Sequence, residues 1–494
     1  MRLAIASLFT LALLAGMLFS ILLALSYVVG FINIYVLLGL TIGINFVMWL
    51  IGPKISDFIY RVFYKVRWIS ISELRDKSPK AAKTIEKICN KYKFRIPKLG
   101  IIPDKNPNAF TYGSGRWNAR IIVTEGIFEY LDENEISAVY AHELGHIKNR
   151  DFIVMTVASV ILQLLYELFV ISRSVSKEGA RTKKGERADI YIILIGIISY
   201  VFYLVGQYIL LYLSRVREYY ADEFSAKNTD PNHLSSALIK IAYGILANPD
   251  NVRLIESTKF IGIMNFKSAK SIGMVYYNCE RLNDFKPLVK ALLFDIYNPW
   301  AYISELSSTH PLTGKRIRRL CSLSKKPLFD FGSFETKYKI NKQVLYKNFI
   351  KDLAVLSFPF IATFIYIPIV GYLVYGGRLS FSLGILGGFF LLLGFSTLIL
   401  TLYKYPSCKE KPSSILELMS DLYASPVRGK CVSLNGKIVG RGIPGLIFSE
   451  DMLFEDSTGL IYINYESWLP ILGNLLFGIR KVRHLIGREA EVKG

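Results

Sequence analysis

Apolar residues along this chain gather in blocks that are long enough to cross a lipid bilayer. No charged side chain stands between Arg2 and Lys54, a stretch that suits two spans at about residues 3–27 and 32–50. The other apolar blocks cover residues 152–172, 190–213, 353–375 and 379–403. A helix needs about 20 mostly apolar residues to cross the hydrocarbon core. The pattern therefore predicts an α-helical multi-pass membrane protein.

The polar segments between these blocks are expected to form water-facing domains. In the first of them, residues 54–67 predict an amphipathic helix at the membrane surface. Strands are predicted at residues 101–102 and 121–124, on either side of a turn-rich stretch at residues 106–115. A helix is then expected to begin at an N-cap, either Asp132 or Asn134. After the fourth apolar block the chain reads as mostly helical again, with Asp230 and Pro231 marking a helix start.

The segment after residue 413 has a different pattern, in which short β-rich runs are separated by glycines. A helix at residues 415–423 comes first. The β-rich runs follow at residues 430–439, 452–454, 459–465 and 489–492. Short strands of this kind predict a small C-terminal β-rich domain, such as an OB-like barrel.

The charge of the chain points to a membrane partner. The chain has 494 residues, a formal net charge of +21 and 52% hydrophobic residues. A basic surplus can serve nucleic-acid binding, but these basic residues do not surround an aromatic platform for bases. In a membrane protein, Lys and Arg collect on cytoplasmic segments and contact anionic lipid. We therefore expect the lipid bilayer as a partner, no nucleic acid, and polar domains in the cytoplasm.

The hairpin formed by the third and fourth blocks does not follow the positive-inside rule. Its loop is basic, and so are its flanks at Arg150 and Arg215. Either the loop is translocated or the hairpin does not fully span the membrane, and both alternatives return the chain to the same side. The five cysteines are scattered singly, which predicts neither a disulfide framework nor a thiolate zinc site. This spacing fits reduced, cytosol-facing domains.

The candidate chemistry begins at residues 142–146, which read H-E-x-x-H. His142 and His146 are four residues apart and share one face of a helix. They can present two imidazole nitrogens to one metal ion, with Glu143 beside them to move a proton. The alternative is a polar, solvated helix face.

A catalytic zinc site needs a third protein ligand and an open position. The first polar stretch beyond the hairpin offers Glu218 and Asp222, which are also four residues apart. Glu218 is a candidate ligand, and Asp222 a candidate acceptor for the second N–H of a ligand histidine. On spacing alone, a solvated acid pair that compensates Arg215 and Arg217 explains these residues equally well.

With these residues together, the chain resembles the HtpX/Ste24 membrane zinc metalloproteases of peptidase family M48, and is closer to the HtpX branch. The motifs that carry the resemblance are Asn108-Ala109-Phe110, residues 142–146 with Asn149 and Asp151, residues 218–222, and Thr309-His310-Pro311. Together with the flanking apolar hairpins they cover about residues 1–320. The spans at 353–403 and the β-rich tail lie beyond the usual HtpX pattern.

The resemblance implies a mainly α, zincin-like metalloprotease domain that binds one Zn²⁺ per chain. His142, His146 and Glu218 would be the metal ligands. Glu143 would act as general base and acid. Asp222 would support a ligand from behind. His310 would stabilise the oxyanion. The alternative role for His310 is that of a structural histidine before a proline turn. Asn108, Ala109 and Phe110 would form an edge strand that pairs with an extended substrate.

The implied function is a zinc endopeptidase at the cytoplasmic face of the plasma membrane, acting on membrane or misfolded proteins in quality control. One alternative is a non-catalytic membrane scaffold that contains zinc. Another is a CAAX-type prenyl-protein protease, although the additional N-terminal spans of Ste24 relatives are missing here. No pattern predicts an oligomeric state. The expected order begins with an N-terminal hairpin (residues 1–53), a first catalytic segment (54–151) and an apolar hairpin (152–213). A second catalytic segment (214–346), a further transmembrane hairpin (353–403) and a β-rich domain (413–494) follow.

Overall fold

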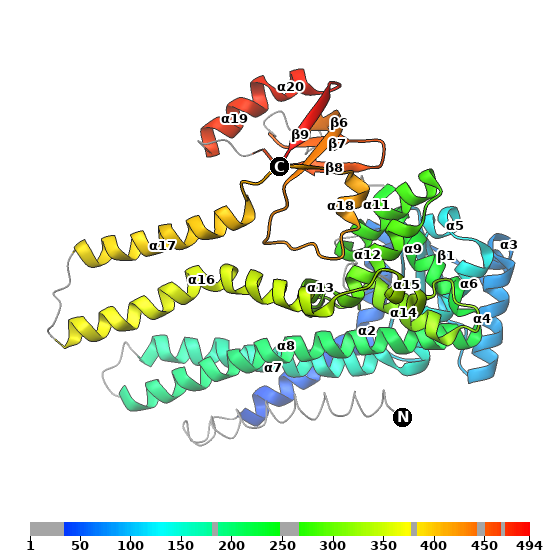
Figure 1. Ribbon diagram of the computed structural model, residues 1–494. Coiled ribbons are helices and arrows are strands. Elements are labelled where there is room, and N and C mark those ends of the chain that lie inside the picture. The colour runs from blue at the N-terminus through cyan, green and yellow to red at the C-terminus, as the bar shows by residue number, and fades with distance from the viewer. Residues whose placement is uncertain (1–33, 180–185, 248–265, 377–382, 442–449, 466–469) are drawn as a thin grey trace. The chain divides into compact units, whose positions relative to one another are not determined.

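A computed structural model describes residues 34–179, 186–247, 266–376, 383–441, 450–465 and 470–494. The chain forms two compact units, one of Met1–Gly273 with Ile303–Phe331 and one of Met274–Tyr302 with Gly332–Gly494. The first predicted span, at residues 3–27, lies outside the described residues. Most described residues are helical, as the sequence predicts, and Figure 1 shows the elements along the chain.

The first unit contains a four-stranded sheet in the order β1-β2-β4-β3. The strands are β1 (Arg67–Ile69), β2 (Lys98–Ile102), β3 (Ala109–Gly113) and β4 (Ala119–Thr124). β2 and β4 pair in parallel, whereas β1 and β3 run antiparallel to their neighbours. The prediction of a turn-rich stretch at 106–115 was partly wrong, because five of its residues form β3. Pairing with the buried strand β4 outweighs the local turn signals.

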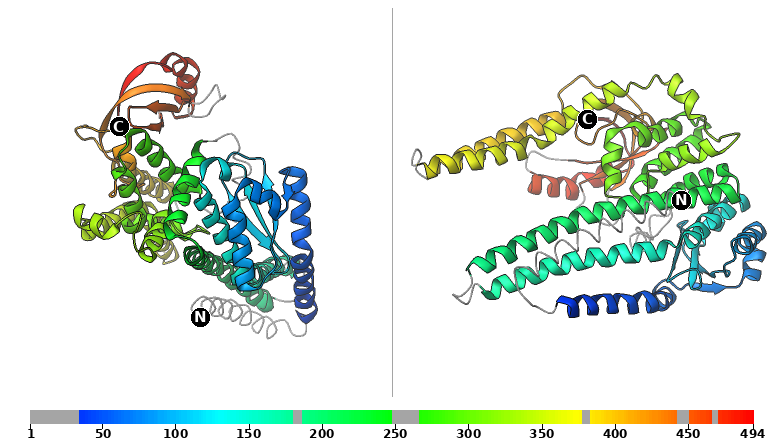
Figure 2. Two further views of the ribbon diagram at one scale, coloured as in Figure 1. Left: turned by 90° about the vertical axis from the view of Figure 1, so that its right-hand side faces the viewer. Right: turned by 90° about the horizontal axis from the view of Figure 1, so that it is seen from below.

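Alternate residues of β3 point to opposite faces of the sheet, as in any strand. On one face, Phe110 and Tyr112 pack on Tyr60 of α2 (Ile34–Phe63), with ring centroids 5.2 and 5.5 Å apart. On the other face, the Thr111 hydroxyl reaches Glu143 of α6 (Glu133–Asn149). The sheet therefore lies between α2 and α6 (Figure 2).

α2 joins the second predicted span and the predicted amphipathic helix into one helix with Pro53 inside it. Asp57 attaches this helix to the sheet. Its carboxylate accepts hydrogen bonds from the Tyr112 hydroxyl at 2.8 Å and from Arg120 Nε at 2.9 Å. These hydrogen bonds of Asp57 join the water-facing sheet directly to the end of the apolar helix α2.

Short helices surround the sheet and lead to α6. They are α3 (Ile71–Lys77), α4 (Pro79–Tyr92) and α5 (Gly126–Tyr130). α6 begins at Asp132, which accepts from the Glu135 amide while Glu135 accepts from the Asp132 amide. This capping box confirms Asp132 as the N-cap and sets where the histidine-bearing helix begins.

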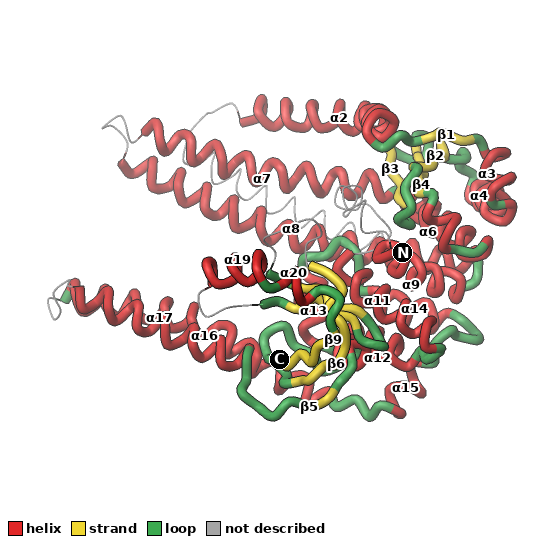
Figure 3. Tube along the Cα trace, turned by 90° about the horizontal axis from the view of Figure 1, so that it is seen from above, coloured by secondary structure: helices red, strands yellow, loops and turns green. Residues whose placement is uncertain are grey.

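Two long helices, α7 (Asp151–Gly179) and α8 (Glu186–Asn228), follow α6 and run side by side (Figures 1 and 3). Their contact buries Ala158, Leu162, Leu165, Leu168 and Ile195. α8 does not end at residue 213, where the apolar block ends, because the polar residues that follow are also compatible with a helix. The same helix therefore carries Glu218 back to the sheet.

The described residues after α8 are helical as far as α17, in parts of both units. α9 (Pro231–Ala247) begins at Pro231 as predicted, and the Asn232 amide donates to Asp230 Oδ1 at 2.8 Å. The chain continues through α11 (Phe266–Leu282), α12 (Lys286–Tyr297), α13 (Pro299–Leu306), α14 (Thr313–Leu323) and α15 (Phe331–Lys337). α9 and α14 pack near α6 and α8, so the metal-ligand candidates lie inside a helical core.

The second unit holds the last two apolar helices, α16 (Lys342–Tyr375) and α17 (Leu383–Lys404). α16 begins before its apolar block, since Asn341 caps it through the Val344 amide at 3.1 Å. Within the described portion of the chain, four helices are long and apolar enough to cross a membrane: α7, α8, α16 and α17.

The predicted β-rich tail forms a five-stranded sheet in the order β5-β6-β7-β8, and β9 pairs with β6. Its elements are β5 (Lys411–Pro412), α18 (Ile415–Met419), β6 (Val432–Arg441), β7 (Met452–Glu455), β8 (Leu460–Ile463), α19 (Pro470–Arg480), α20 (Val482–Leu485) and β9 (Glu489–Lys493). All four predicted β-rich runs contain strands, whereas α19 and α20 were not predicted. Among the described residues β8 and β9 are not paired, so an OB-like barrel stays a prediction.

One expectation about cysteine was wrong. Cys408 and Cys431 form a disulfide, with Cα atoms 6.0 Å apart. Parallel pairing of Lys411 with Val432 brings the two cysteines together, and spacing along the chain does not reveal this. The cysteine pattern therefore gives no support for a reduced compartment.

Candidate metal centre

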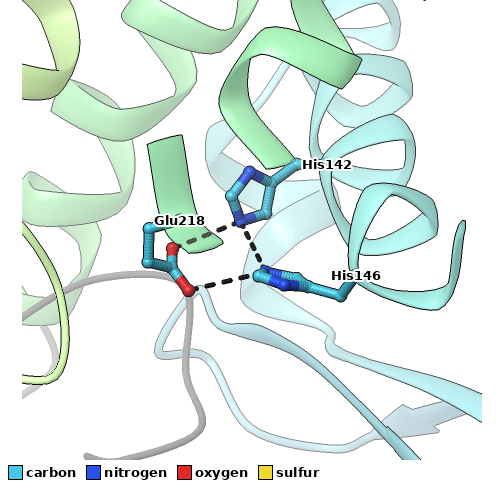
Figure 4. Close-up of side chains that lie close together, drawn as sticks. All are labelled: His142, His146 and Glu218. Carbon is cyan, nitrogen blue, oxygen red and sulfur yellow. Dashed lines mark hydrogen bonds and ion pairs between the residues drawn. The ribbon is translucent and has the colours of Figure 1, made fainter. Parts of the chain in front are cut away.

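The two histidines of α6 and the glutamate of α8 meet in the core of the first unit. His142 Nε2 and His146 Nε2 are 3.2 Å apart. Glu218 Oε2 lies 3.5 Å from His142 Nε2, and Glu218 Oε1 lies 3.5 Å from His146 Nε2. Figure 4 shows the three side chains turned toward one another. Ligands about 2.0–2.1 Å from a tetrahedral metal lie about 3.3 Å from one another, so this spacing suits one ion.

A close approach of α6 and α8 makes this meeting possible. A Cβ added at Gly145 would lie 3.0 Å from Ala221 Cα and 3.3 Å from the Phe224 side chain. The Ser225 hydroxyl also donates to the Ala138 carbonyl at 2.7 Å. The small residue between the two histidines therefore lets the second helix come near enough to deliver Glu218.

Each histidine faces a carboxylate on its outer side. His146 Nδ1 lies 2.6 Å from Asp151 Oδ2, and His142 Nδ1 lies 3.0 Å from Asp222 Oδ1. The second contact is an ion pair, because His142 Nδ1 has no hydrogen-bond partner among the described residues. Burial would lower the pKa of His142, but Asp222 and Glu218 outweigh burial and raise it to about 9. The carboxylates thus stabilise positive charge at this point, and they orient each ring so that Nε2 faces the centre.

Arginines hold both outer carboxylates in place. Arg316 of α14 donates to Asp222 twice, through Nε at 2.9 Å and Nη2 at 2.6 Å. Arg217 Nη2 donates to Asp151. Asp222 therefore turns toward His142 and Arg316. The alternative of a solvated acid pair fails, because Glu218 and Asp222 are both buried.

Two further side chains complete the site. Glu143 is buried on α6 and accepts a hydrogen bond from the Thr111 hydroxyl of β3. His310 comes from the connection between α13 and α14, and its Nε2 lies 3.6 Å from Glu218 Oε1. Burial lowers the pKa of His310 to about 4, so its imidazole is neutral. Arg215 fixes this connection by donating to the Ser308 carbonyl at 2.7 Å.

The residues present fit a metal ion. The candidate ligand atoms of His142, His146 and Glu218 all lie within 4.8 Å of one another. Glu218 Oε2 is buried and accepts no hydrogen bond from the described residues, and its ion-pair contacts with His142 Nε2 and Arg316 Nη2 are long, at 3.5 and 3.6 Å. A buried carboxylate oxygen without a donor is costly unless a cation satisfies it. Two imidazoles and one carboxylate are a common ligand set of catalytic zinc.

Three residues of this site have roles that the sequence did not predict. Asp151 was named only as a member of a motif, whereas Thr111 and Arg316 carried no signal at all. Thr111 lies on a strand that is 32 residues from Glu143, and Arg316 lies 94 residues from Asp222. No periodicity within one element could have linked these pairs.

A helix-borne H-E-x-x-H sequence, a glutamate from a second helix and long apolar helices define a membrane metalloprotease. Residues 76–324 match the model of peptidase family M48. The chain belongs to this family, and the curated proteins that it resembles are protease HtpX homologs.

The chain is similar to the following proteins. A protease HtpX homolog of Methanothermobacter thermautotrophicus is 34% identical over 235 residues, which cover 46% of this chain and 81% of the relative. A protease HtpX homolog of Aquifex aeolicus is 33% identical over 282 residues, which cover 55% and 79%. Among solved structures, S. mikatae Ste24p is 19% identical with a TM-score of 0.37, covering 65% of this chain and 66% of Ste24p.

Arg316 provides a prediction for the support of the metal centre. Arg316→Met would leave Asp222 buried without its main partner, so His142 would lose its fixed orientation. We expect zinc affinity to fall about 10–100-fold, the usual effect of removing such support. Competition with a fluorescent zinc chelator measures the change. Arg319→Met, three residues along α14 and paired with Glu223 instead, should leave the affinity unchanged, and equal losses in both variants would contradict the role of Arg316.

Proposed function

We propose that the chain is a zinc endopeptidase that hydrolyses peptide bonds of membrane or misfolded proteins at the cytoplasmic face of the plasma membrane. The observation that carries this proposal is the cluster of His142, His146 and Glu218, with ligand atoms within 4.8 Å of one another and Glu143 on the same helix. One Zn²⁺ per chain would be held by these three residues. Four-ligand closure is typical of structural zinc, and a three-residue set leaves a position for water.

The protein's own residues supply the proton transfers. Zinc, when bound, would supply Lewis-acid activation of the attacking water and of the scissile carbonyl. Glu143 accepts the proton of the water and later delivers it to the leaving amine. The Thr111 hydroxyl donates to Glu143 Oε2, so it holds the carboxylate in one orientation. His310, neutral and beside Glu218, donates a hydrogen bond to the developing oxyanion.

The edge strand β3 is the proposed binding surface for an extended substrate. Among the described strands β3 pairs only with β4, so its other edge is available for a peptide backbone. Of the three candidate residues Asn108, Ala109 and Phe110, Asn108 already bonds Thr124 of β4 through both its amide and its carbonyl, and Phe110 is fully buried. A peptide would therefore pair with the main-chain groups of β3 that point away from β4. Thr111 lies on the same strand and touches Glu143. A peptide on this edge would therefore lie next to the catalytic carboxylate.

The membrane setting supports the substrate class. α2, α7 and α8 extend from one side of the sheet (Figure 3), so the metal centre lies near the ends of apolar helices. The excess of basic residues favours the cytoplasmic side. A site close to the membrane surface suits membrane proteins and unfolded segments as substrates. The proposed role in quality control follows from the resemblance to HtpX proteases. A prenylated CAAX substrate is the alternative.

Metal removal tests this proposal. We expect chelator-treated protein to lose cleavage of casein and of an unfolded membrane protein, and one equivalent of Zn²⁺ per chain to restore it. Metal analysis before and after treatment gives the stoichiometry. A prenylated CAAX peptide in the same assay separates the alternative substrate class. Full activity of the metal-free protein would refute the mechanism, and bound zinc without any cleavage would favour a scaffold.

A further inference from the structure

A basic pocket of about 520 Å³ lies in the first unit, outside the set of metal-ligand candidates. Four cations line it: Lys93, Arg95, Arg116 and Arg150. No carboxylate is among the described residues that line the pocket. Within the same described ranges, none of these four cations forms an ion pair. A group of cations without counter-charges repels itself and attracts anions.

The fold gathers these cations from separate elements. Lys93 and Arg150 follow the last turns of α4 and α6, both in the left-handed conformation with φ of 53° and 60°. Arg116 belongs to the connection between β3 and β4. Cations at helix C-termini are favourable by themselves, which accounts for Lys93 and Arg150. Arg95 and Arg116 are not at helix ends, so helix electrostatics does not account for the whole cluster.

Arg116 is the most constrained of the four. Its Nη2 donates to the Lys148 carbonyl in the last turn of α6, whereas its Nε is buried and has no hydrogen-bond partner among the described residues. Burial and the nearby charge of Arg150 lower the pKa of Arg116. A guanidinium with a free buried donor beside a second arginine is an arrangement that an anionic oxygen would satisfy.

The apolar side of the pocket points to a lipid as the source of the anion. Phe94, Trp117 and Ile153 complete the lining, and Ile153 lies in the first turn of α7. The Trp117 ring is packed edge-on against Trp49 of α2, with centroids 6.0 Å apart, yet Trp117 is 59% exposed. Tryptophans concentrate at the membrane–water interface. α2 and α7 both extend from this end of the sheet (Figure 3).

We propose that this pocket binds the phosphate-bearing headgroup of an anionic membrane phospholipid. Arg116 and Arg150 hold the phosphate, Lys93 and Arg95 add attraction from the rim, and Trp117 lies at the level of the glycerol backbone. An acidic peptide would use the cations but would not need an exposed tryptophan at the end of two apolar helices. The bound headgroup would also contact the end of α6, the helix that carries His142 and His146.

The test uses the full-length protein in detergent with short-chain phosphatidylglycerol as the probe, followed by tryptophan fluorescence. We expect Arg116→Gln/Arg150→Gln to weaken binding about 30-fold, from the usual contribution of each cation near a lipid surface. Lys93→Gln/Arg95→Gln removes two exposed cations that form no ion pair with the described residues, so it should fold normally and weaken binding in the same direction. The control is Lys83→Gln/Lys87→Gln, an equal charge change on the exposed face of α4, which should have no effect.

Three further measurements separate the sources of the anion. Glycerol phosphate and an acidic peptide should each bind at least tenfold more weakly than the lipid. Trp117→Ala should weaken lipid binding and leave glycerol phosphate binding unchanged. Equal losses in the control variant would show a net-charge effect and overturn the proposal. Tighter binding of the acidic peptide would assign the pocket to a protein partner, and equal affinity for glycerol phosphate would assign it to a soluble anion.

Discussion

Glu143→Gln is expected to abolish peptide hydrolysis while the protein keeps its zinc. Glutamine has the shape of glutamate and can still accept the Thr111 hydroxyl bond, but it cannot take a proton from water. General acid–base catalysis contributes about 10²–10⁴-fold, so we expect kcat to fall by that factor. Cleavage of casein and zinc content, measured on the same preparation, provide the two readouts.

The matched control for this variant is Glu129→Gln. Glu129 is exposed on α5, and the substitution removes the same charge from the same water-facing domain. It should leave both kcat and zinc content unchanged. Retained cleavage in Glu143→Gln would remove Glu143 from the proposed mechanism. Loss of zinc together with activity would instead assign it to the metal-binding residues.

Glu218→Ala is expected to lose the metal. Zinc binding in small proteins is worth about 10–16 kcal/mol over four ligands, or about 3 kcal/mol for each. One missing ligand should therefore weaken binding at least about a hundredfold. Arg316 Nη2, 3.6 Å from Glu218 Oε2, would also lose a neighbouring negative charge. Metal analysis after dialysis against a weak chelator measures the loss.

Glu223→Ala is the control for the ligand variant. Glu223 is on the same helix, but it pairs with Lys227 at 2.6 Å and with Arg319 at 3.2 Å. It should keep zinc at the wild-type level. Undiminished zinc in Glu218→Ala would exclude Glu218 as a ligand and leave the centre with two histidines.

The proposed centre also constrains the topology. Glu218 lies beyond the hairpin of α7 and α8, and His146 lies before it. A shared metal therefore requires Arg150 and Arg215 to be on one side of the membrane. This requirement holds for both alternatives that the basic loop leaves open, a translocated loop and a hairpin that does not fully span.

Local patterns were sufficient for much of this protein. The spacing of His142 and His146 indicated a shared helix face, and the helix start was recognisable as either Asp132 or Asn134, of which the structure selects Asp132. The apolar blocks and the β-rich runs of the tail were also recognisable. In each case the decisive interaction joins neighbours in sequence, or repeats with the period of one element.

What only the tertiary structure decided involves residues far apart in the chain. Arg316 holds Asp222 across 94 residues and Thr111 holds Glu143 across 32, while the disulfide depends on the pairing of β5 with β6. Residues 109–113 of the turn-rich stretch at 106–115 form β3 for the same reason. Such contacts depend on which elements pack together, and packing is a property of the whole fold. The sequence by itself determined the helix that carries the candidate ligands His142 and His146, and tertiary packing determined which side chains support them.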